Sequence, residues 1–326
     1  MRNLYIIGNG FDIYHGLDTK YQSFASYLHR KDGEIYGYLL IYYGLPDIVY
    51  DTVSDEDYEA WSTFEIALAD LDYEQVLEDH SDSMANPALE DFRDRDWHTY
   101  QIDMELIIKQ LTTDLISIFN QFILNVQYPS DINDRRLNLI PQSKYLNFNY
   151  TDTLERFYNV DSTDICYIHE KSSVDDCKIV LGHGTDPAVF EIKEPEEPEG
   201  LSQDDLIRWK EYMADREDYS LRSAKDEILS YYTKSFKNTL TVIEEKIKFF
   251  ESLDYIERIY VLGHSISEVD IKYFEAVKNH SPLAVKWYVT YYSDSEKANH
   301  MKALLQRKTV LLFYFLRSLN HMHLIA

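Results

Sequence analysis

The chain has 326 residues, of which 45% are hydrophobic, so it is long enough to bury one large core or two smaller ones. Its 57 acidic and 32 basic residues give a net charge of −25, and because this charge repels nucleic-acid phosphates we expect no general DNA or RNA binding. Cys166 and Cys177 are too few for a disulfide framework or a four-cysteine zinc site, and no apolar run near either end is long enough to span a membrane. These features predict a globular, cytoplasmic protein.

The first predicted strand, residues 3–7, leads directly into a turn that contains Gly8 and Gly10. Glycines let the backbone turn sharply and approach a diphosphate without Cβ atoms in the way, and the helix expected next offers free N–H groups. The spacing indicates a nucleotide pocket, although Ile13 stands where the dinucleotide fingerprint has its third glycine. The alternative is a glycine turn that only joins a strand to a helix.

Further segments of β-type composition follow, separated mostly by helical sequence. They are 144–148, 165–169, 178–182, 257–263, 285–292 and 309–315. This alternation predicts an α/β fold, a single domain over residues 1–326 with a Rossmann-like parallel sheet. The 28 tyrosines look scattered and are expected to serve as half-buried packing.

Two helical insertions, about 50–130 and about 195–253, are expected as a cap on the sheet, where they frame a pocket or contact a second copy of the chain. In the first, apolar residues at three- and four-residue steps predict a long amphipathic helix within 91–126: Phe92, Tyr100, Met104, Ile107, Leu111, Leu115, Ile118 and Phe122. Glu59 and Glu65 are expected on a solvated helix face.

The second insertion begins with an acidic, proline-containing run, 191–200, that is typical of a linker. Residues 202–253 then show a near-heptad rhythm that predicts a helical hairpin: Leu221, Ala224, Ile228, Tyr232, Phe236, Leu240, Ile243, Ile247 and Phe250. If the protein is a homo-oligomer, Phe236 and Ile243 are expected at the contact.

Four polar segments each lie at the carboxyl end of a predicted strand, where open α/β sheets bind their ligands. They read Gly-Asn-Gly-Phe-Asp at 8–12, Leu-Asn-Phe-Asn-Tyr-Thr-Asp at 146–152, Tyr-Ile-His at 167–169 and Val-Leu-Gly-His-Ser-Ile-Ser at 261–267. Because carboxyl ends of parallel strands share one edge of the sheet, we expect the four segments to converge.

Together with His15-Gly16-Leu17 and the later Asp270, the order of these segments resembles the bacteriophage abortive-infection AbiH family over nearly the whole chain. That family is itself similar to sirtuin-like NAD-binding proteins over the sheet and its loops. The resemblance implies an anti-phage defence protein with a sirtuin-like pocket that hydrolyses NAD to nicotinamide and ADP-ribose. The lack of a four-cysteine zinc module argues against a deacetylase.

The sirtuin motifs are matched in part. The matching positions are Gly8, Gly10, Gly16 and Leu17 in Gly-Ala-Gly-x-Ser-x-x-Ser-Gly-Ile-Pro, Asn149 in Thr-x-Asn-x-Asp, His169 in His-Gly, and Gly263, Ser265, Ile266 and Asp270 in the late Gly-x-Ser-Leu motif with its following acid. Three positions depart: Asp12 replaces a serine, Thr151 replaces the aspartate, and Glu170 replaces the glycine after the histidine.

Cleavage of the nicotinamide–ribose bond builds positive charge on the ribose, so it needs a fixed sugar and a water aimed at C1′. The resemblance implies that Asn149 holds the water or ribose and that His169 acts as general base. The residues expected to bind NAD are Gly8, Asn9, Gly10, Phe11, Asp12, His15, Asp152, Gly263, His264, Ser265 and Asp270. The simpler alternatives are that Asn149 and Asp152 cap the next helix and that His169 is a core residue.

Two other functions stay open. Glu170 and Thr151 favour a catalytically silent sensor that binds NAD or ADP-ribose and signals through the insertions. His169, His183, Asp186 and His264 have the side-chain chemistry of a metal-dependent hydrolase, although their spacing matches no metal motif. An anti-phage role also implies a phage-derived trigger.

Overall fold

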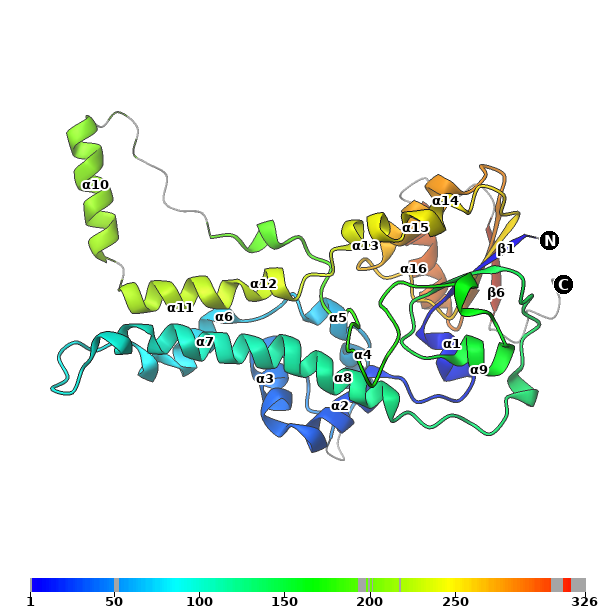
Figure 1. The fold of residues 1–326 in the computed structure, drawn as a ribbon, viewed down its shortest axis with the longest axis horizontal. Helices are drawn as coiled ribbons and strands as arrows, with labels where there is room; N and C mark the ends of the chain where they lie inside the picture. The colour runs from blue at the N-terminus through cyan, green and yellow to red at the C-terminus, as the bar shows by residue number, and fades with distance from the viewer. Residues whose placement is uncertain are drawn as a thin grey trace.

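The computed structural model contains a six-stranded sheet in which every neighbouring pair of strands is parallel. The sheet lies in the right-hand part of the molecule in Figure 1. The structure describes residues 2–49, 53–192, 198, 200, 202–216, 218–305 and 313–317. The strands are β1 (Asn3–Ile7), β2 (Lys144–Asn147), β3 (Ile165–Tyr167), β4 (Arg258–Leu262), β5 (Lys286–Tyr291) and β6 (Phe313–Arg317). The predicted α/β class with a parallel sheet is confirmed; 309–312, predicted as part of the last strand, lie outside the described residues.

The strand order is β3-β2-β1-β4-β5-β6. From the central β1 the chain builds outward through β2 and β3, and then returns to the other side of β1 for β4, β5 and β6. This reversal creates a switch point between the carboxyl ends of β1 and β4. In open α/β sheets, ligands bind in the crevice at such a point.

The predicted strand at 178–182 does not exist in the structure. Ile179 and Leu181 are buried on either side of the less buried Val180, as in a strand, but they pack in the core of the helices rather than on the sheet. The segment continues against residues 235–237, where His183 N–H donates to the Ser235 carbonyl oxygen over 3.0 Å. The pattern of the sequence thus correctly predicts buried residues, but these residues belong to the core of the helical layer and not to that of the sheet.

Four tyrosines form a row across one face of the sheet, which corrects the expectation of scattered packing. Tyr5 stacks on Tyr145 and on Tyr260 with centroids 5.1 Å apart, and Tyr260 stacks on Tyr288 at 5.0 Å. These residues are in register on β2, β1, β4 and β5, so their rings point to the same face.

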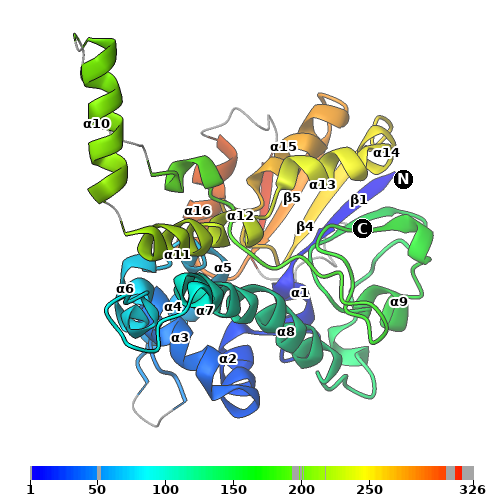
Figure 2. The same cartoon turned by 60° about the vertical axis from the view of Figure 1, so that its left-hand side comes forward.

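The helices are α1 (Asn9–Tyr14), α2 (Tyr21–Lys31), α3 (Gly33–Tyr43), α4 (Asp55–Ser62), α5 (Phe64–Ala67), α6 (Tyr73–Asp79), α7 (Thr99–Lys109), α8 (Leu115–Leu124), α9 (Thr153–Tyr158), α10 (Gln203–Arg216), α11 (Tyr219–Leu229), α12 (Tyr231–Lys234), α13 (Thr239–Glu245), α14 (Ile247–Glu251), α15 (Ile271–His280) and α16 (Asp294–Leu305). The tyrosine face packs against α1 and α9. The opposite face packs against α13, α14, α15 and α16, as Figure 2 shows for α13 and α15. No helix within the described residues has the length and apolar character needed to cross a membrane.

A separate helical layer lies at the carboxyl ends of the strands (Figure 1). Its core combines α2, α3, α7, α8, α11 and α12, so it also includes helices that precede residue 50. The predicted long helix is confirmed from Thr99 to Leu124, with a π-helical turn at Gln110–Asp114 between α7 and α8. Phe92 lies before this helix, in a turn, and its ring packs edge-on against Trp97.

The second insertion is not a helical hairpin. It forms five helices, α10 to α14, and α11 packs along α7 of the first insertion, while α10 stands apart in both views (Figures 1 and 2). The near-heptad pattern breaks because its residues serve two cores: Ile228 packs in the helical layer and Ile243 packs against the sheet. Ile243 is partly buried in this contact, and a role of Phe236 and Ile243 in a contact between copies of the chain stays a prediction. The acidic run that was expected as a linker lies largely outside the described residues.

Candidate functional site

Two loops touch at the switch point of the sheet. Gly10 N–H donates to the carbonyl oxygen of Gly263 over 2.7 Å, and Gly8 N–H donates to that of Leu262 over 3.0 Å. A Cβ atom on Gly8 would lie 2.6 Å from Cα of His264, and one on Gly10 would lie 2.9 Å from Cα of Gly263. Gly263 also has a φ of +64°, in the left-handed region that favours glycine. Close contact between the loops after β1 and β4 therefore explains these three glycines.

A buried hydroxyl–carboxyl pair lies beside this contact. Thr151 Oγ1, in the loop after β2, donates a 2.6 Å hydrogen bond to Oδ2 of Asp12 in α1. Asp12 is 1% exposed, and its Oδ1 has no hydrogen-bond partner. Loss of hydration raises the pKa of Asp12 to about 6, although the hydrogen bond from Thr151 and the nearby polar side chains of Thr153 and Asn149 act in the opposite direction. Asp12 therefore exchanges a proton close to neutral pH.

Asn149 links the loop after β2 to the loop after β1. Its Nδ2 donates to the Gly8 carbonyl oxygen over 3.1 Å, and its backbone N–H donates to Oδ1 of Asn147 over 3.0 Å. The capping alternative is wrong for both candidate residues, because α9 begins after Asp152 without a side-chain capping bond. Asp152 instead pairs with Arg156 one turn along the helix at 3.3 Å.

Two histidines approach Asp270 from different strands. His169, two residues after β3, places Nε2 3.5 Å from Oδ1 of Asp270, and His264, two residues after β4, places Nε2 3.6 Å from Oδ2. The N–H of Ile266 donates to Nδ1 of His264, so Nε2 of His264 carries the ring proton and faces the carboxylate. Burial lowers the pKa of His264 to about 4, which keeps this ring neutral.

Asp270 is the anion at the centre of this group. Burial acts to raise its pKa, but His169, Lys237 and His264 together outweigh burial and hold the pKa below its ordinary value. Asp270 is therefore ionised and can orient a neighbouring imidazole, as the aspartate of a catalytic triad does.

A buried ion pair from the two insertions adjoins His169. Nζ of Lys237, between α12 and α13, donates to Oε2 of Glu65 on α5 over 2.6 Å and lies 3.4 Å from Nε2 of His169. Tyr21 donates its hydroxyl hydrogen to Oε1 of the same glutamate over 2.6 Å. The side chain of Lys237 is 1% exposed and that of Glu65 is 15% exposed, so the solvated face predicted for Glu65 is wrong. Glu59 is exposed, as predicted.

The helical layer covers this group of side chains. Asn149, His169 and His264 are each no more than 5% exposed. The ring of Tyr150 stacks on His169 with centroids 5.9 Å apart, and its hydroxyl donates to the carbonyl oxygen of Val180 over 3.0 Å. These side chains are therefore largely shielded from solvent.

Other residues predicted to bind a ligand have partners within the chain. Nδ2 of Asn9 donates to the carbonyl oxygen of Thr19 over 3.0 Å. Phe11 is fully buried against the sheet. The ring nitrogens of His15 lie 2.7 Å from the Phe11 carbonyl oxygen and 2.7 Å from the Tyr158 hydroxyl. Ser265 is exposed. Ligand contacts by these residues stay predictions.

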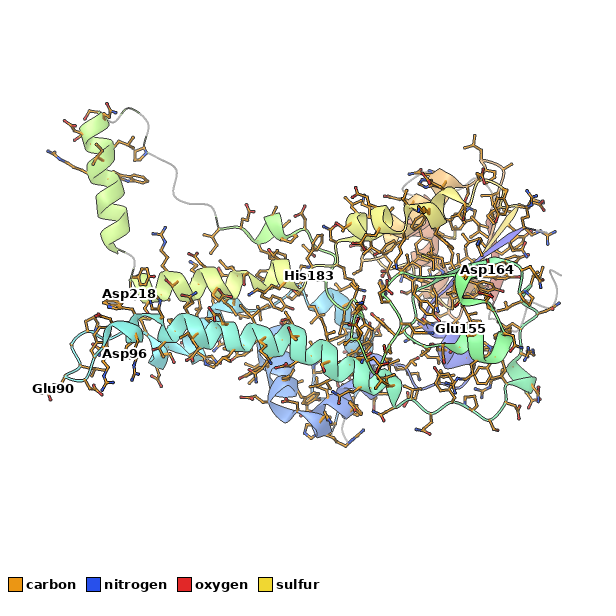
Figure 3. All side chains as sticks on the ribbon, viewed as in Figure 1. Glu90, Asp96, Glu155, Asp164, His183 and Asp218 are labelled. Atoms are coloured by element: carbon orange, nitrogen blue, oxygen red, sulfur yellow. The ribbon has the colours of Figure 1, made fainter. Side chains whose placement is uncertain are left out.

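The four residues considered for a metal hydrolase do not form one group. His169 and His264 meet at Asp270, but Asp186 is exposed and its side chain accepts a hydrogen bond from Ala188 N–H. His183 is buried among aromatic rings that include Tyr231 and Tyr232 of α12, as Figure 3 shows for its position beside that helix. Among the residues that the structure describes, no group of three histidine, cysteine or acidic side chains is arranged to hold a metal ion.

Sequence reasoning missed Glu65 and Lys237. Glu65 follows the buried Phe64 and precedes the buried Leu68, which places it at the edge of a buried helix face and was the one available signal. Nothing in the sequence around Lys237 indicates that this lysine is buried.

The fold and the site together define an α/β protein with an all-parallel sheet and a buried acid–base cluster at the carboxyl ends of its strands. Residues 4–291 match the family described as bacteriophage abortive infection AbiH, and the chain belongs to this family. Membership associates the protein with abortive infection in the defence against bacteriophages. Comparisons with curated proteins and with solved structures gave no match.

Proposed function

We propose that this AbiH protein acts in abortive infection by hydrolysing NAD to nicotinamide and ADP-ribose in a sirtuin-like pocket at the switch point. The strand order is the one found in Rossmann dinucleotide-binding folds, and its switch point carries the glycine turn of β1. In this proposal Asn149 holds the ribose or the attacking water, and His169, oriented by Asp270, accepts a proton.

The observation that carries the proposal is the contact between Thr151 and Asp12. The sirtuin motifs have a serine at the place of Asp12 and an aspartate at the place of Thr151. Here the hydroxyl and the carboxyl have exchanged positions and are joined by the 2.6 Å hydrogen bond. The two departures from the motif therefore compensate each other in space.

The third departure, Glu170, is also accommodated. Glu170 has a φ of +59°, so the backbone after His169 adopts the left-handed conformation that a glycine at this place favours. Its carboxylate accepts a hydrogen bond from Nζ of Lys246, which directs the side chain toward α13 and α14. The replacement of the glycine by Glu170 is thus compatible with the proposed site, because the backbone after His169 keeps a conformation that glycine favours.

The experiment is a time course of NAD, nicotinamide and ADP-ribose by chromatography. It compares wild type, Asn149→Ala and His169→Ala, each purified from uninfected and from phage-infected cells, because the covered site predicts that activity depends on a trigger. Loss of a general base lowers the rate by about 10²–10⁴-fold, so His169→Ala should release almost no nicotinamide. His98→Ala, exposed at the far end of the helical layer, is the matched control and should keep wild-type activity.

Intact NAD in every sample, including wild type from infected cells, would overturn hydrolysis. NAD or ADP-ribose binding measured by calorimetry on the same samples would then favour the sensor.

A further inference from the structure

We propose that Lys237 is a positioning residue that keeps Nε2 of His169 unprotonated, and that its withdrawal lets His169 carry a proton at Nε2 and donate a hydrogen bond from it to Asp270. The inference deepens the proposed function and rests on it for the assignment of His169 as general base. The arrangement of the three side chains carries it.

Nε2 of His169 lies between two groups with opposite requirements. It is 3.4 Å from Nζ of Lys237 and 3.5 Å from Oδ1 of Asp270. An ammonium group can only donate, so it needs an unprotonated Nε2, whereas a carboxylate can only accept and needs Nε2–H. One nitrogen cannot satisfy both groups at the same time.

Of the two contacts of Nε2, the one with Lys237 has the geometry of a hydrogen bond, while the contact with Asp270 is nearly as short and lowers the pKa of that carboxyl. Nζ of Lys237 is within hydrogen-bonding distance of Nε2, while Oδ1 of Asp270 is buried without a hydrogen-bond partner. A buried carboxylate oxygen without a donor is costly, and a proton on Nε2 of His169 would supply one. Asp270 is thus prepared to receive a hydrogen bond that Lys237 prevents.

The other groups around His169 leave Lys237 and Asp270 as the two neighbours that set its tautomer. Glu65 lies behind Lys237 at 2.6 Å, and His264 lies behind Asp270 at 3.6 Å. The rings of Tyr150 and Tyr273 also face His169, and burial raises the pKa of both hydroxyls, so they stay neutral.

The two tautomers differ in what His169 can do. With Lys237 in place, Nδ1 carries the ring proton and the Nε2 lone pair is occupied, so neither nitrogen can accept a proton from a substrate. After Lys237 withdraws, the ring exchanges protons with solvent, losing one at Nδ1 and gaining one at Nε2. Nε2–H then donates to Asp270, and Nδ1 has the free lone pair of a general base.

This arrangement links the insertions to the site. Lys237 belongs to the second insertion and its partner Glu65 to the first, so their shared ion pair holds Lys237 against His169 only while both insertions stay on the sheet. A trigger that shifts either insertion would change the tautomer of His169.

The test is ¹⁵N NMR of the full chain labelled at histidine. The chain has 11 histidines, and the spectrum of His169→Gln identifies the His169 signals. Two buried histidines serve as internal references: Nδ1 of His15 donates to the Phe11 carbonyl oxygen, and Nδ1 of His264 accepts from Ile266 N–H. Wild-type His169 should show the Nδ1–H pattern of His15, and in Lys237→Met it should change to the Nε2–H pattern of His264.

Further variants show whether a change in the His169 tautomer comes from the loss of Lys237 or from a general destabilisation of the fold. Glu65→Gln removes the charge of Glu65 but keeps a side-chain oxygen that can accept from Nζ of Lys237, so Lys237 should stay beside His169 and the wild-type tautomer should persist. The double variant E65Q/K237M should show the Nε2–H pattern without leaving the Glu65 carboxylate unpaired. Lys234→Met, which breaks an exposed 2.9 Å ion pair with Glu227, is the matched control and should not change the His169 signals. The proposal is overturned if His169 keeps one tautomer in both variants that lack Lys237, or if Glu65→Gln causes the same change as they do.

The NAD assay on these proteins distinguishes this inference from the proposed function. A tautomer change without NAD cleavage in any sample supports the inference and counts against hydrolysis. NAD cleavage with an unchanged tautomer supports hydrolysis and counts against a role of Lys237.

Discussion

Thr151 donates a 2.6 Å hydrogen bond to Asp12 across 139 positions of sequence, from the loop after β2 to the first helix. Both residues lie at the carboxyl edge of the sheet, where the glycine turn of β1 meets the loop of β4. Both side chains are buried, and burial is the largest influence on the protonation of Asp12.

Asp12→Asn should flatten the pH dependence of stability. The pKa of Asp12 is raised from 3.8 to about 6 in the folded chain, so its stabilising contribution is complete below about pH 4 and is lost as the pH rises through 6. Relative to the variant, wild type should lose about 3 kcal/mol of unfolding free energy over this range. Urea unfolding at a series of pH values from 4 to 7 measures the difference. Asp254→Asn, at an exposed position, should keep the wild-type slope, and the same slope in Asp12→Asn would show that Asp12 does not titrate in this range.

Gly263→Ala should destabilise the fold strongly. Its φ of +64° costs a residue with a Cβ atom about 1–2 kcal/mol, and that atom would lie 2.5 Å from the carbonyl carbon of Gly10, an overpacking that adds about 1–3 kcal/mol. Gly37→Ala is the control, because Gly37 lies inside α3 with open space around it. It should gain about 0.5–1 kcal/mol in unfolding free energy. Denaturant titration measures both, and a neutral Gly263→Ala would show that the two loops do not touch.

The sheet was predictable because its strands are short apolar runs that are buried on both faces, a pattern that does not depend on their neighbours. The segment 178–182 shows the limit of that argument. Alternating hydrophobic residues indicate that one side of a segment is buried, but they do not indicate which core buries it. Ile179 and Leu181 pack among helices. The motif residues Asn149, His169 and Asp270 were predictable because they directly follow strands or precede a helix at one edge of the sheet.

Lys237 and Glu65 were not predictable for a different reason. They are 172 positions apart, and each is buried only because the other supplies the opposite charge. Local sequence carries no information about such a pair, since a lone lysine or glutamate is most often exposed. The same holds for Asp12 and Thr151, whose hydrogen bond forms only when the two loops are brought together.

Tyr158→Phe should destabilise the protein through two lost hydrogen bonds. The hydroxyl of Tyr158 accepts from the Leu137 backbone N–H over 2.9 Å and lies 2.7 Å from Nε2 of His15. Because both partners are buried and each unsatisfied group costs about 1–3 kcal/mol, we expect a loss of about 2–5 kcal/mol in unfolding free energy. Tyr292→Phe, at a position 89% exposed, is the control and should change stability by less than about 0.5 kcal/mol. Equal stability of both variants would mean that Tyr158 does not hold His15.

The ion pair of Lys237 and Glu65 should show strong coupling in a double-mutant cycle. Lys237→Met leaves the carboxylate of Glu65 with hydroxyl donors alone, from Tyr21 at 2.6 Å and Tyr150 at 3.4 Å, and we expect a loss of about 3–5 kcal/mol. In the double variant E65Q/K237M the side chain at position 65 is neutral and no longer leaves a carboxylate without its lysine, so the loss should be smaller than the sum of the two single losses by about 1–3 kcal/mol.

The exposed pair of Lys234 and Glu227 provides the comparison for this cycle. Its lysine side chain is 49% exposed, and because water screens the charges the coupling should stay below about 1 kcal/mol. Urea unfolding of both cycles at pH 7 gives the two coupling energies. Equal, small couplings would mean that water screens the Lys237–Glu65 pair and that this pair does not hold Lys237 in place. The interaction of Lys237 with Nε2 of His169 would then be too weak to compete with that of Asp270.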